Sequence, residues 1–246
     1  MAYNFQSEED VKEYLNNLGI EYRFGCYSEK NPEVCHLLGD YLEAVKKEYE
    51  KSNVIYKNNC DEFDYGKSCY KYGVYRLLGK GGQKQDAAVA YQYLKKACEL
   101  GNPSACLSQG LLLISNDENS GIQRDVSKAF SLLEKSCQDN NANACYFLSG
   151  MYISGVKKPS VKASPEKEIK QEDYDVPKNM QEAFKLAQKG CELGNVYCCV
   201  NLSQMYKKGD GVDKNQELAE KYKNIAKEMQ NQLQSDKTLT FQEGLA

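Results

Sequence analysis

Eleven cysteines are the residues of this 246-residue chain whose chemistry is easiest to read. Thiols form disulfides, bind metals or act as nucleophiles, and their spacing distinguishes these roles. Ten of them fall into pairs with seven or eight residues between the two members. The pairs are Cys26 and Cys35, Cys60 and Cys69, Cys98 and Cys106, Cys137 and Cys145, and Cys191 and Cys199. This regular spacing predicts five disulfides, each closing a short loop.

The last pair has two candidates for its closing member, Cys198 and Cys199. A small residue stands four places after each closing cysteine: Gly39, Gly73, Gly110, Ser149 and, counted from Cys199, Ser203. A glycine or asparagine stands ten places after it in the last four units: Gly79, Asn116, Gly155 and Gly209. Counting from Cys198 gives a leucine and a lysine instead. The register therefore selects Cys199 for the disulfide and leaves Cys198 as a free thiol.

The cysteine pairs also mark an internal repeat. Their first members lie 34, 38, 39 and 54 residues apart, which is the range of repeats built from helix pairs. The segments that flank them, such as DAAVAYQYLKKAC and CYKYGVYRLLG, carry apolar residues at helical spacing. Each unit therefore reads as a helix, a short turn and an antiparallel helix. We expect the small residue to let the two helices of a pair approach, and the later glycine or asparagine to cap the second helix.

The predicted fold is an all-α solenoid of five disulfide-bridged antiparallel helix pairs, related to tetratricopeptide-type repeats, with a C-terminal capping helix. A single solenoid is expected over residues 1–232, followed by a loose tail at 233–246. The segment 156–177 is rich in Lys, Glu, Ser and Pro and reads as a flexible surface insertion. The repeats are expected at about 8–46, 47–79, 86–115, 124–155 and 178–208, and the capping helix at 213–232.

Composition excludes several classes of protein. The net charge is −3 with both signs spread along the chain, so no nucleic-acid surface is expected. No apolar run approaches the roughly 18 residues of a membrane-spanning helix. The single histidine, His36, reads as a helix-surface residue, and no CxxC spacing indicates a zinc site. We expect a monomer with no catalytic and no metal-binding residues, and the residues alone predict no cofactor and identify no cofactor-binding site.

Other readings of the same residues remain open. The ten paired cysteines could be reduced thiols packed as small apolar side chains, in an adaptor of the cytosol or the endoplasmic reticulum. Cys198 could exchange with the neighbouring Cys191–Cys199 disulfide, as in a thiol-disulfide enzyme. The SxxK pattern of β-lactamases and penicillin-binding enzymes starts at Ser68, Ser154 and Ser164, although no SDN or KTG motif accompanies it.

The repeat sequences resemble a known kind of protein. KACELGNPSAC, KGCELGNVYCC and YKKGDGVDKNQELAEKY resemble cysteine-bridged Sel-one-like repeats, which bacterial cysteine-rich penicillin-binding proteins also use. EEDVKEYLNNLGIEYRFGCYSEKNPEVCHLLGDYLE and SCYKYGVYRLLGKGG extend the resemblance over nearly the whole chain to the cytochrome c oxidase assembly factor seven family. Members of this family are also labelled β-lactamase-like.

This resemblance implies a function. It points to a non-enzymatic assembly factor or scaffold for respiratory complex IV, with protein partners in that assembly. It also implies residence in the mitochondrial intermembrane space and import by the disulfide relay there. That route needs no cleaved presequence, and the N-terminal stretch MAYNFQSEEDVKEYLNNLG reads as neither a secretory signal nor a transit peptide.

Haem binding and a thiol-disulfide activity are associated with the family, so the resemblance implies that both are possible for this chain. Ser28 stands where a family histidine is expected in the stretch after Cys26. A histidine-ligated haem would therefore have to use His36. The sequence does not indicate which partner is bound or which face binds it.

Overall fold

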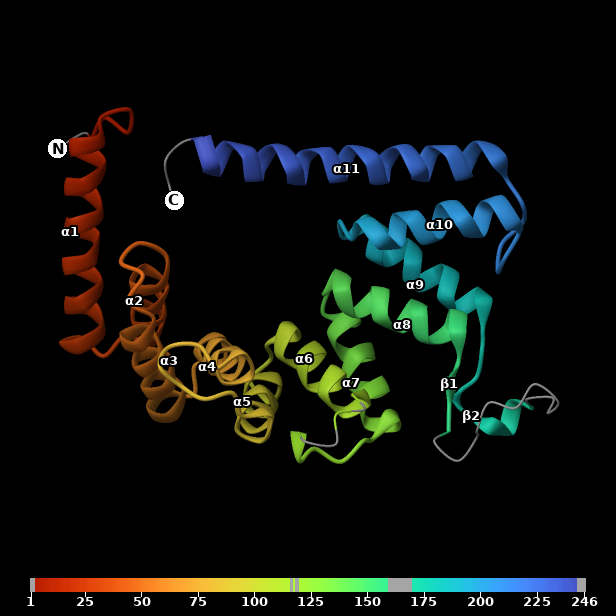
Figure 1. Cartoon of the computed structure of the whole chain (residues 1–246), viewed down its shortest axis with the longest axis horizontal. Coiled ribbons are helices and arrows are strands. Elements are labelled where there is room, and N and C mark those ends of the chain that lie inside the picture. The colour runs from red at the N-terminus through yellow and green to blue at the C-terminus, as the bar shows by residue number, and fades with distance from the viewer. Residues whose placement is uncertain (1–2, 116, 118–119, 159–169, 243–246) are drawn as a thin grey trace. The chain divides into compact units, whose positions relative to one another are not determined.

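The computed structural model of the chain describes residues 3–115, 117, 120–158 and 170–242. Within these ranges the chain is helical apart from one short pair of strands (Figure 1). The all-α class and the helix-pair architecture are thereby confirmed. The chain divides into two compact units, residues 1–124 and 125–246. The boundary between them lies in the polar stretch SNDENSGIQRD, residues 115–125, and the single solenoid over residues 1–232 stays a prediction.

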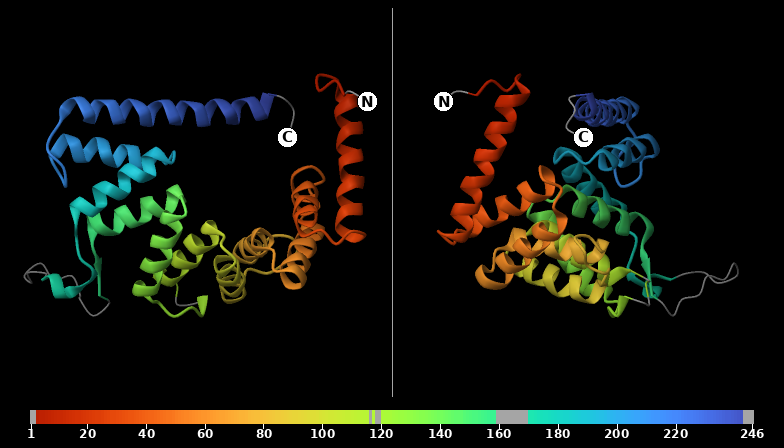
Figure 2. Two further views of the ribbon diagram at one scale, coloured as in Figure 1. Left: turned by 180° about the vertical axis from the view of Figure 1, so that it is seen from behind. Right: turned by 60° about the vertical axis from the view of Figure 1, so that its left-hand side comes forward.

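The described part of the first unit consists of three antiparallel helix hairpins. Helix α2 packs against α3, and α4 packs against α5, so that successive hairpins lie side by side (Figures 1 and 2). The helices are α1 (Glu8–Tyr27) and α2 (Pro32–Ala44), α3 (Tyr49–Phe63) and α4 (Gly66–Leu78), and α5 (Ala87–Glu99) and α6 (Pro103–Ile114).

The second unit contains two further hairpins and a long final helix, which packs against the last hairpin (Figure 1). The hairpin helices are α7 (Val126–Gln138) and α8 (Ala142–Ser154), and α9 (Met180–Glu192) and α10 (Val196–Lys208). The final helix is α11 (Gln216–Gln242). Between α8 and α9 lie β1 (Val156–Lys157), a 3-10 helix (Gln171–Asp173) and β2 (Tyr174–Val176).

The hairpin turns follow one local rule. The residue that precedes the N-cap of each second helix has a positive φ, and these residues are Lys30, Asp64, Gly101, Asn140 and Gly194. In four of the five turns the N-cap itself is an asparagine whose side chain accepts backbone N–H groups of the first helical turn: Asn31, Asn102, Asn141 and Asn195. Glycine and asparagine tolerate the left-handed backbone, and asparagine is a strong N-cap. The turn sequence therefore ends one helix and starts the next.

The small residues after the closing cysteines have a different role from the predicted one. Four of them, Gly39, Gly73, Ser149 and Ser203, face the helix that follows their hairpin and not the partner helix of their own hairpin. A Cβ atom at Gly73 of α4 would lie 2.9 Å from Cγ of Leu94 in α5. The Ser203 hydroxyl of α10 donates a hydrogen bond of 2.8 Å to the carbonyl of Ala219 in α11. Small side chains thus allow neighbouring hairpins to approach closely.

The predicted glycine caps are found at two of the four positions. Gly79 and Gly209 adopt the left-handed conformation at the ends of α4 and α10. Gly155 also has a positive φ of 70°, but its ψ of 153° is extended because the chain turns directly into β1. Asn116 lies outside the described residues.

Two boundary expectations require correction. The ends of the 156–177 insertion are not uniformly flexible, because β1 and β2 pair in antiparallel fashion. Residues 159–169 between them lie outside the described part. The last helix does not end at 232, because α11 continues to Gln242. Residues 233–242, LQSDKTLTFQ, contain neither glycine nor proline, so nothing in this stretch stops a helix.

Candidate functional site

Five disulfides close the five hairpin turns, one in each hairpin. The two sulfur atoms of each bridge lie 2.03 to 2.11 Å apart, and the two Cα atoms lie 4.5 to 4.8 Å apart. All ten cysteines are buried. The structure pairs Cys191 with Cys199, as the register predicts, and leaves Cys198 unpaired. Each bridge joins the end of one helix to the start of the next.

Cys198 is a packing residue in this structure. Its side chain is fully buried, and it fills space beside Gly190, where a Cβ atom would collide with the Cys198 sulfur. Burial raises the pKa of the Cys198 thiol to about 12. A thiol needs its thiolate form and access to a disulfide in order to exchange with it. This geometry therefore does not favour a redox role for Cys198.

The same two positions face each other in other hairpins. The residues that precede the opening and the closing cysteine are Gly25 and Val34 in the first hairpin and Asn59 and Ser68 in the second. A Cβ atom at Gly25 would lie 2.7 Å from Val34 Cγ1. The Asn59 amide donates a hydrogen bond of 2.8 Å to the Ser68 hydroxyl. A large residue on one side thus meets a small or hydrogen-bonding residue on the other.

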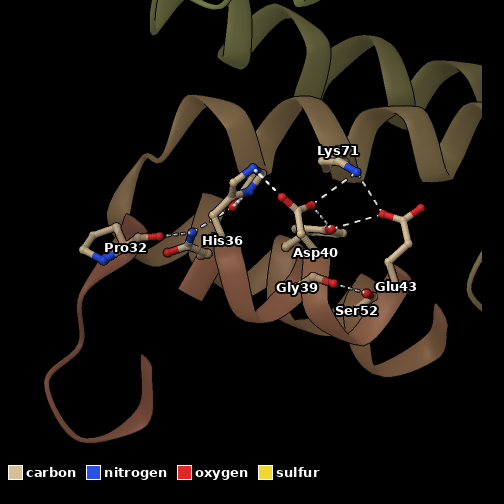
Figure 3. A network of polar contacts seen from close by, with 10 residues as sticks. Pro32, His36, Gly39, Asp40, Glu43, Ser52 and Lys71 are labelled. Atoms are coloured by element: carbon tan, nitrogen blue, oxygen red, sulfur yellow. Dashed lines mark hydrogen bonds and ion pairs between the residues drawn. The ribbon is translucent and has the colours of Figure 1, made fainter. Parts of the chain in front are cut away.

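A polar network extends from this second pair into the first hairpin (Figure 3). His36 of α2 is buried, and its Nδ1 lies 3.0 Å from the Ser68 hydroxyl. Because the Ser68 oxygen accepts from Asn59, its own proton is available for Nδ1 of a neutral imidazole. Nε2 of His36 lies 3.5 Å from Asp40 Oδ2. The Tyr56 hydroxyl donates a hydrogen bond of 2.6 Å to the same carboxylate.

Two lysines lie at the other end of the network, and Figure 3 shows one of them, Lys71. Lys71 lies 2.9 Å from Glu43 and 3.3 Å from Asp40, and Lys80 lies 2.6 Å from Glu43. Burial raises the pKa of Glu43, but the hydrogen bonds and charges of the two lysines outweigh it and lower the pKa to about 2. The network therefore joins α2 to α4 through paired charges.

The expectation that His36 lies on the helix surface is wrong. Its ring lies between those of Tyr56 and Tyr65, with centroids 5.6 and 5.5 Å away. Burial lowers the pKa of His36, and the nearby lysines Lys71 and Lys67 lower it further, whereas Asp40 acts in the opposite direction. The sequence offered one signal, a histidine directly after a paired cysteine, but the residues around it come from other helices.

A histidine-ligated haem does not fit this site. His36 is the only histidine of the chain, and both of its ring nitrogens face side chains of the network. An iron atom would need one of these nitrogens with open space beyond it. Tyr56 and Tyr65 pack against the ring instead.

Ser68, the first of the three SxxK serines, is not placed to act as the nucleophile of a hydrolase. Ser68 is fully buried, and Lys71 of the same motif pairs with carboxylates. Ser154 is exposed at the end of α8, and Lys157 of its motif is exposed in β1. Ser164 lies outside the described residues. A serine nucleophile needs both an adjacent base and access to substrate, and Ser68 lacks the access.

Comparison with known proteins places these features in a family. The Sel1 repeat family matches residues 66–102, 112–141, 170–195 and 196–230. A protein of Drosophila melanogaster named cytochrome c oxidase assembly factor 7 homolog is 52% identical, and the match covers 100% of this chain and 98% of the relative. The chain belongs to the cytochrome c oxidase assembly factor 7 family. Members from Xenopus tropicalis and Homo sapiens are 38% and 37% identical, over 96% and 97% of this chain and 95% and 97% of their own.

Solved structures agree on the fold alone. A Sel1 repeat protein from Oxalobacter formigenes superposes with a TM-score of 0.60 at 22% identity, covering 78% of this chain and 69% of its own. The protective antigen c5321 of uropathogenic Escherichia coli gives a TM-score of 0.68 at 19% identity, covering 92% and 49%. Among the described residues, no helix is both long and apolar enough to cross a membrane.

Proposed function

We propose that this chain is a non-enzymatic assembly factor for cytochrome c oxidase, which acts as a disulfide-bridged helical scaffold in the mitochondrial intermembrane space. The observation that carries the proposal is the full-length similarity to proteins named for cytochrome c oxidase assembly. Those names imply a mitochondrial location. Because the match spans nearly the entire length of both chains, the family role applies to the whole protein and not to one shared repeat.

The cysteines support the finer location. Five disulfides are stable in an oxidising compartment and rare where glutathione keeps thiols reduced. The intermembrane space has its own disulfide relay, which the family resemblance implies as the import route. Oxidation at the five hairpin turns would then trap the helix pairs inside that compartment.

The chemistry of the polar groups favours a scaffold over an enzyme. Ser68 and Cys198 are fully buried, and His36 is enclosed by the network. These are three of the side chains that the sequence offers for a hydrolase or a thiol-disulfide enzyme. A stack of helix pairs instead offers extended surface for protein partners.

Deletion of the gene tests the role directly. The proposal predicts a loss of assembled complex IV on native gels and of oxidase activity, with complex II unchanged as the internal control. Expression of the wild-type chain should restore both. Normal complex IV in deleted cells would refute the assembly role.

The location has a separate test. The protein in intact mitochondria should resist added protease and become digestible once the outer membrane is ruptured by swelling. Protection that persists in swollen mitochondria would place it in the matrix, and digestion without swelling would place it outside.

A further inference from the structure

A cleft of about 320 Å³ is lined by residues of α1, α2 and the first half of α3. The buried part of its lining is aliphatic and consists of Leu38, Leu42 and Ile55. Tyr27 and Val54 also line it, and both side chains are about half exposed. Small-molecule sites in proteins occupy roughly 300–1,000 Å³, so this cleft is large enough for a small apolar ligand.

Arg23 is the charged residue that α1 contributes to the cleft. Its side chain is exposed, and it forms no ion pair with any residue in the described part of the chain. The other charges at the cleft come from the start of α3. Lys51 pairs with Glu48 at 2.8 Å, and the Glu50 carboxylate lies against Gly82, where a Cβ atom would be 3.2 Å from Glu50 Oε1. Arg23 is thus the cation of the cleft that lacks an acidic partner among these residues.

The internal repeat shows which group satisfies this position in other hairpins. Arg23 stands three places before the opening cysteine. In the second, third and fifth hairpins the residue at this place contacts a carboxylate one turn further along the helix. These pairs are Lys57 and Asp61 at 2.5 Å, Lys95 and Glu99 at 3.9 Å, and Gln188 and Glu192 at 3.2 Å. The fourth hairpin reverses the order, with Glu134 before Gln138.

The first hairpin keeps the cation of this pair and lacks the acid. One turn after Arg23 stands Tyr27, which has no carboxylate, and Tyr27 is itself part of the cleft lining. A carboxylate from outside the chain can therefore occupy the place beside Arg23 that a side chain occupies in the later hairpins. The aliphatic residues next to it determine what that carboxylate is attached to.

We propose that this cleft binds a fatty acid, whose carboxylate pairs with Arg23 and whose hydrocarbon chain lies against Leu38, Leu42 and Ile55. A guanidinium and a carboxylate form strong, charge-assisted hydrogen bonds. A hydrocarbon chain suits the aliphatic lining because it carries no polar group that would be buried without a hydrogen-bond partner.

Two features of the cleft disfavour other anions. A peptide would bring backbone N–H and C=O groups against aliphatic side chains that cannot form hydrogen bonds with them. A doubly charged head group such as phosphate would add negative charge near Glu48 and Glu50. A monocarboxylate on an unbranched chain avoids both costs. The inference goes beyond the proposed role in cytochrome c oxidase assembly and does not depend on it.

The test is isothermal titration calorimetry of the full-length oxidised protein with decanoate. Three further probes each change one property of this ligand. Decylammonium reverses the charge, acetate removes most of the chain, and decanedioate adds a second carboxylate at the far end. We expect decanoate to bind at least about tenfold more tightly than each of the three. Its binding should weaken at high salt, because the Arg23 side chain is exposed.

Removal of the cation tests the position of the carboxylate. Arg23→Gln should weaken decanoate binding by about tenfold or more. The matched control is Lys95→Gln, because Lys95 stands at the same place in the third hairpin and already has Glu99 as its partner. Both positions are exposed, so both variants should keep the fold, and the control should leave decanoate binding unchanged.

Addition of the missing acid should displace the ligand. Tyr27→Glu places a carboxylate one turn after Arg23, the arrangement of the second and third hairpins. This variant should bind decanoate about tenfold more weakly than Tyr27→Gln. The glutamine variant is the matched control because it removes the same aromatic ring without adding a charge.

A charge in the apolar part of the cleft tests the position of the chain. Val54→Asp should weaken decanoate binding by about tenfold or more, because the new carboxylate would lie beside the hydrocarbon. Val200→Asp, at an exposed valine of α10, is the matched control and should change nothing.

Four results would overturn the proposal. The first is the absence of decanoate binding, and the second is equal binding of decanoate and decylammonium, which would show that Arg23 does not select an anion. The third is an equal loss of binding in Arg23→Gln and Lys95→Gln, which would indicate attraction to surface charge in general. The fourth is tighter binding of N-acetyl-dileucine than of decanoate, which would identify a peptide carboxylate as the ligand.

Discussion

Gly190 and Cys198 are the pair of residues that explains the eleventh cysteine. The first hairpin places a glycine opposite a valine, and the second an asparagine opposite a serine, at the same two positions. Cys198 occupies the larger half of such a pair, and its sulfur takes the space that Gly190 leaves. Its conversion to a thiolate is disfavoured by burial, which raises the pKa to about 12. The presence of Cys198 is therefore explained by the space that its side chain fills beside Gly190, and not by the reactivity of its thiol.

This account of Cys198 predicts a specific rescue. Gly190→Ala should destabilise the protein by roughly 1–3 kcal/mol, because the new methyl group collides with the Cys198 sulfur. Adding Cys198→Ala should recover much of that loss, since it removes the colliding atom. Urea unfolding of the oxidised single and double variants measures the coupling. Strictly additive effects would show that the two side chains do not compete for space.

His36 predicts a pH dependence in a defined window. Its folded-state pKa lies below the ordinary value of 6.5, because burial disfavours the charged ring. The neutral His36 therefore contributes its full stabilisation above pH 6.5. The free energy of unfolding decreases as the pH drops below that value, because the unfolded chain then binds the proton more readily. Urea midpoints at about pH 7.5 and 5.5 should differ more for the wild type than for His36→Gln. Glu43, with a pKa of about 2, titrates below this window. An equal decline in both proteins would mean that another group is responsible.

At the scale of elements, the sequence predicts the hairpins well and their contacts poorly. Apolar spacing and cysteine register are local signals, and they locate the helix pairs and their turns. The small residues Gly73 and Ser203 were predicted to act within a hairpin but contact the next one. Spacing along the chain shows that a position must be small, but only packing shows which helix it faces. For the same reason the burial of His36 could not be predicted from the sequence, because the residues that surround it lie in α3 and α4.

The turn rule predicts opposite effects at two glycines. Gly194 has a φ of +90° and Gly150 is helical, and a Cβ atom at either would meet nothing within 4 Å. Gly194→Ala should cost roughly 1–2 kcal/mol through backbone strain alone. Gly150→Ala should stabilise α8 by up to about 1 kcal/mol. Thermal unfolding of the two variants gives the comparison. A stabilising Gly194→Ala would show that the turn does not need its left-handed residue.

At the scale of the whole chain, the disulfides and the family relationship support each other. Each bridge closes a loop short enough to be worth about 2.5 kcal/mol in the chain-entropy model, so oxidation should stabilise every hairpin. The names of the relatives imply a mitochondrial location, and the proposed intermembrane space would be the oxidising compartment in which such bridges form. The partner could not be predicted from the sequence, because the repeat pattern determines which side chains are buried between helices and does not identify the surface that a partner contacts.

The most direct test of the account is a thiol count on the protein taken from mitochondria. Cells are quenched in acid, and the chain is alkylated under denaturing conditions without reductant and then weighed. The account predicts that Cys198 alone is alkylated, because the other ten cysteines form the five hairpin bridges. Alkylation of all eleven cysteines would contradict it, since the hairpins would then be reduced and the oxidising compartment would lose its support.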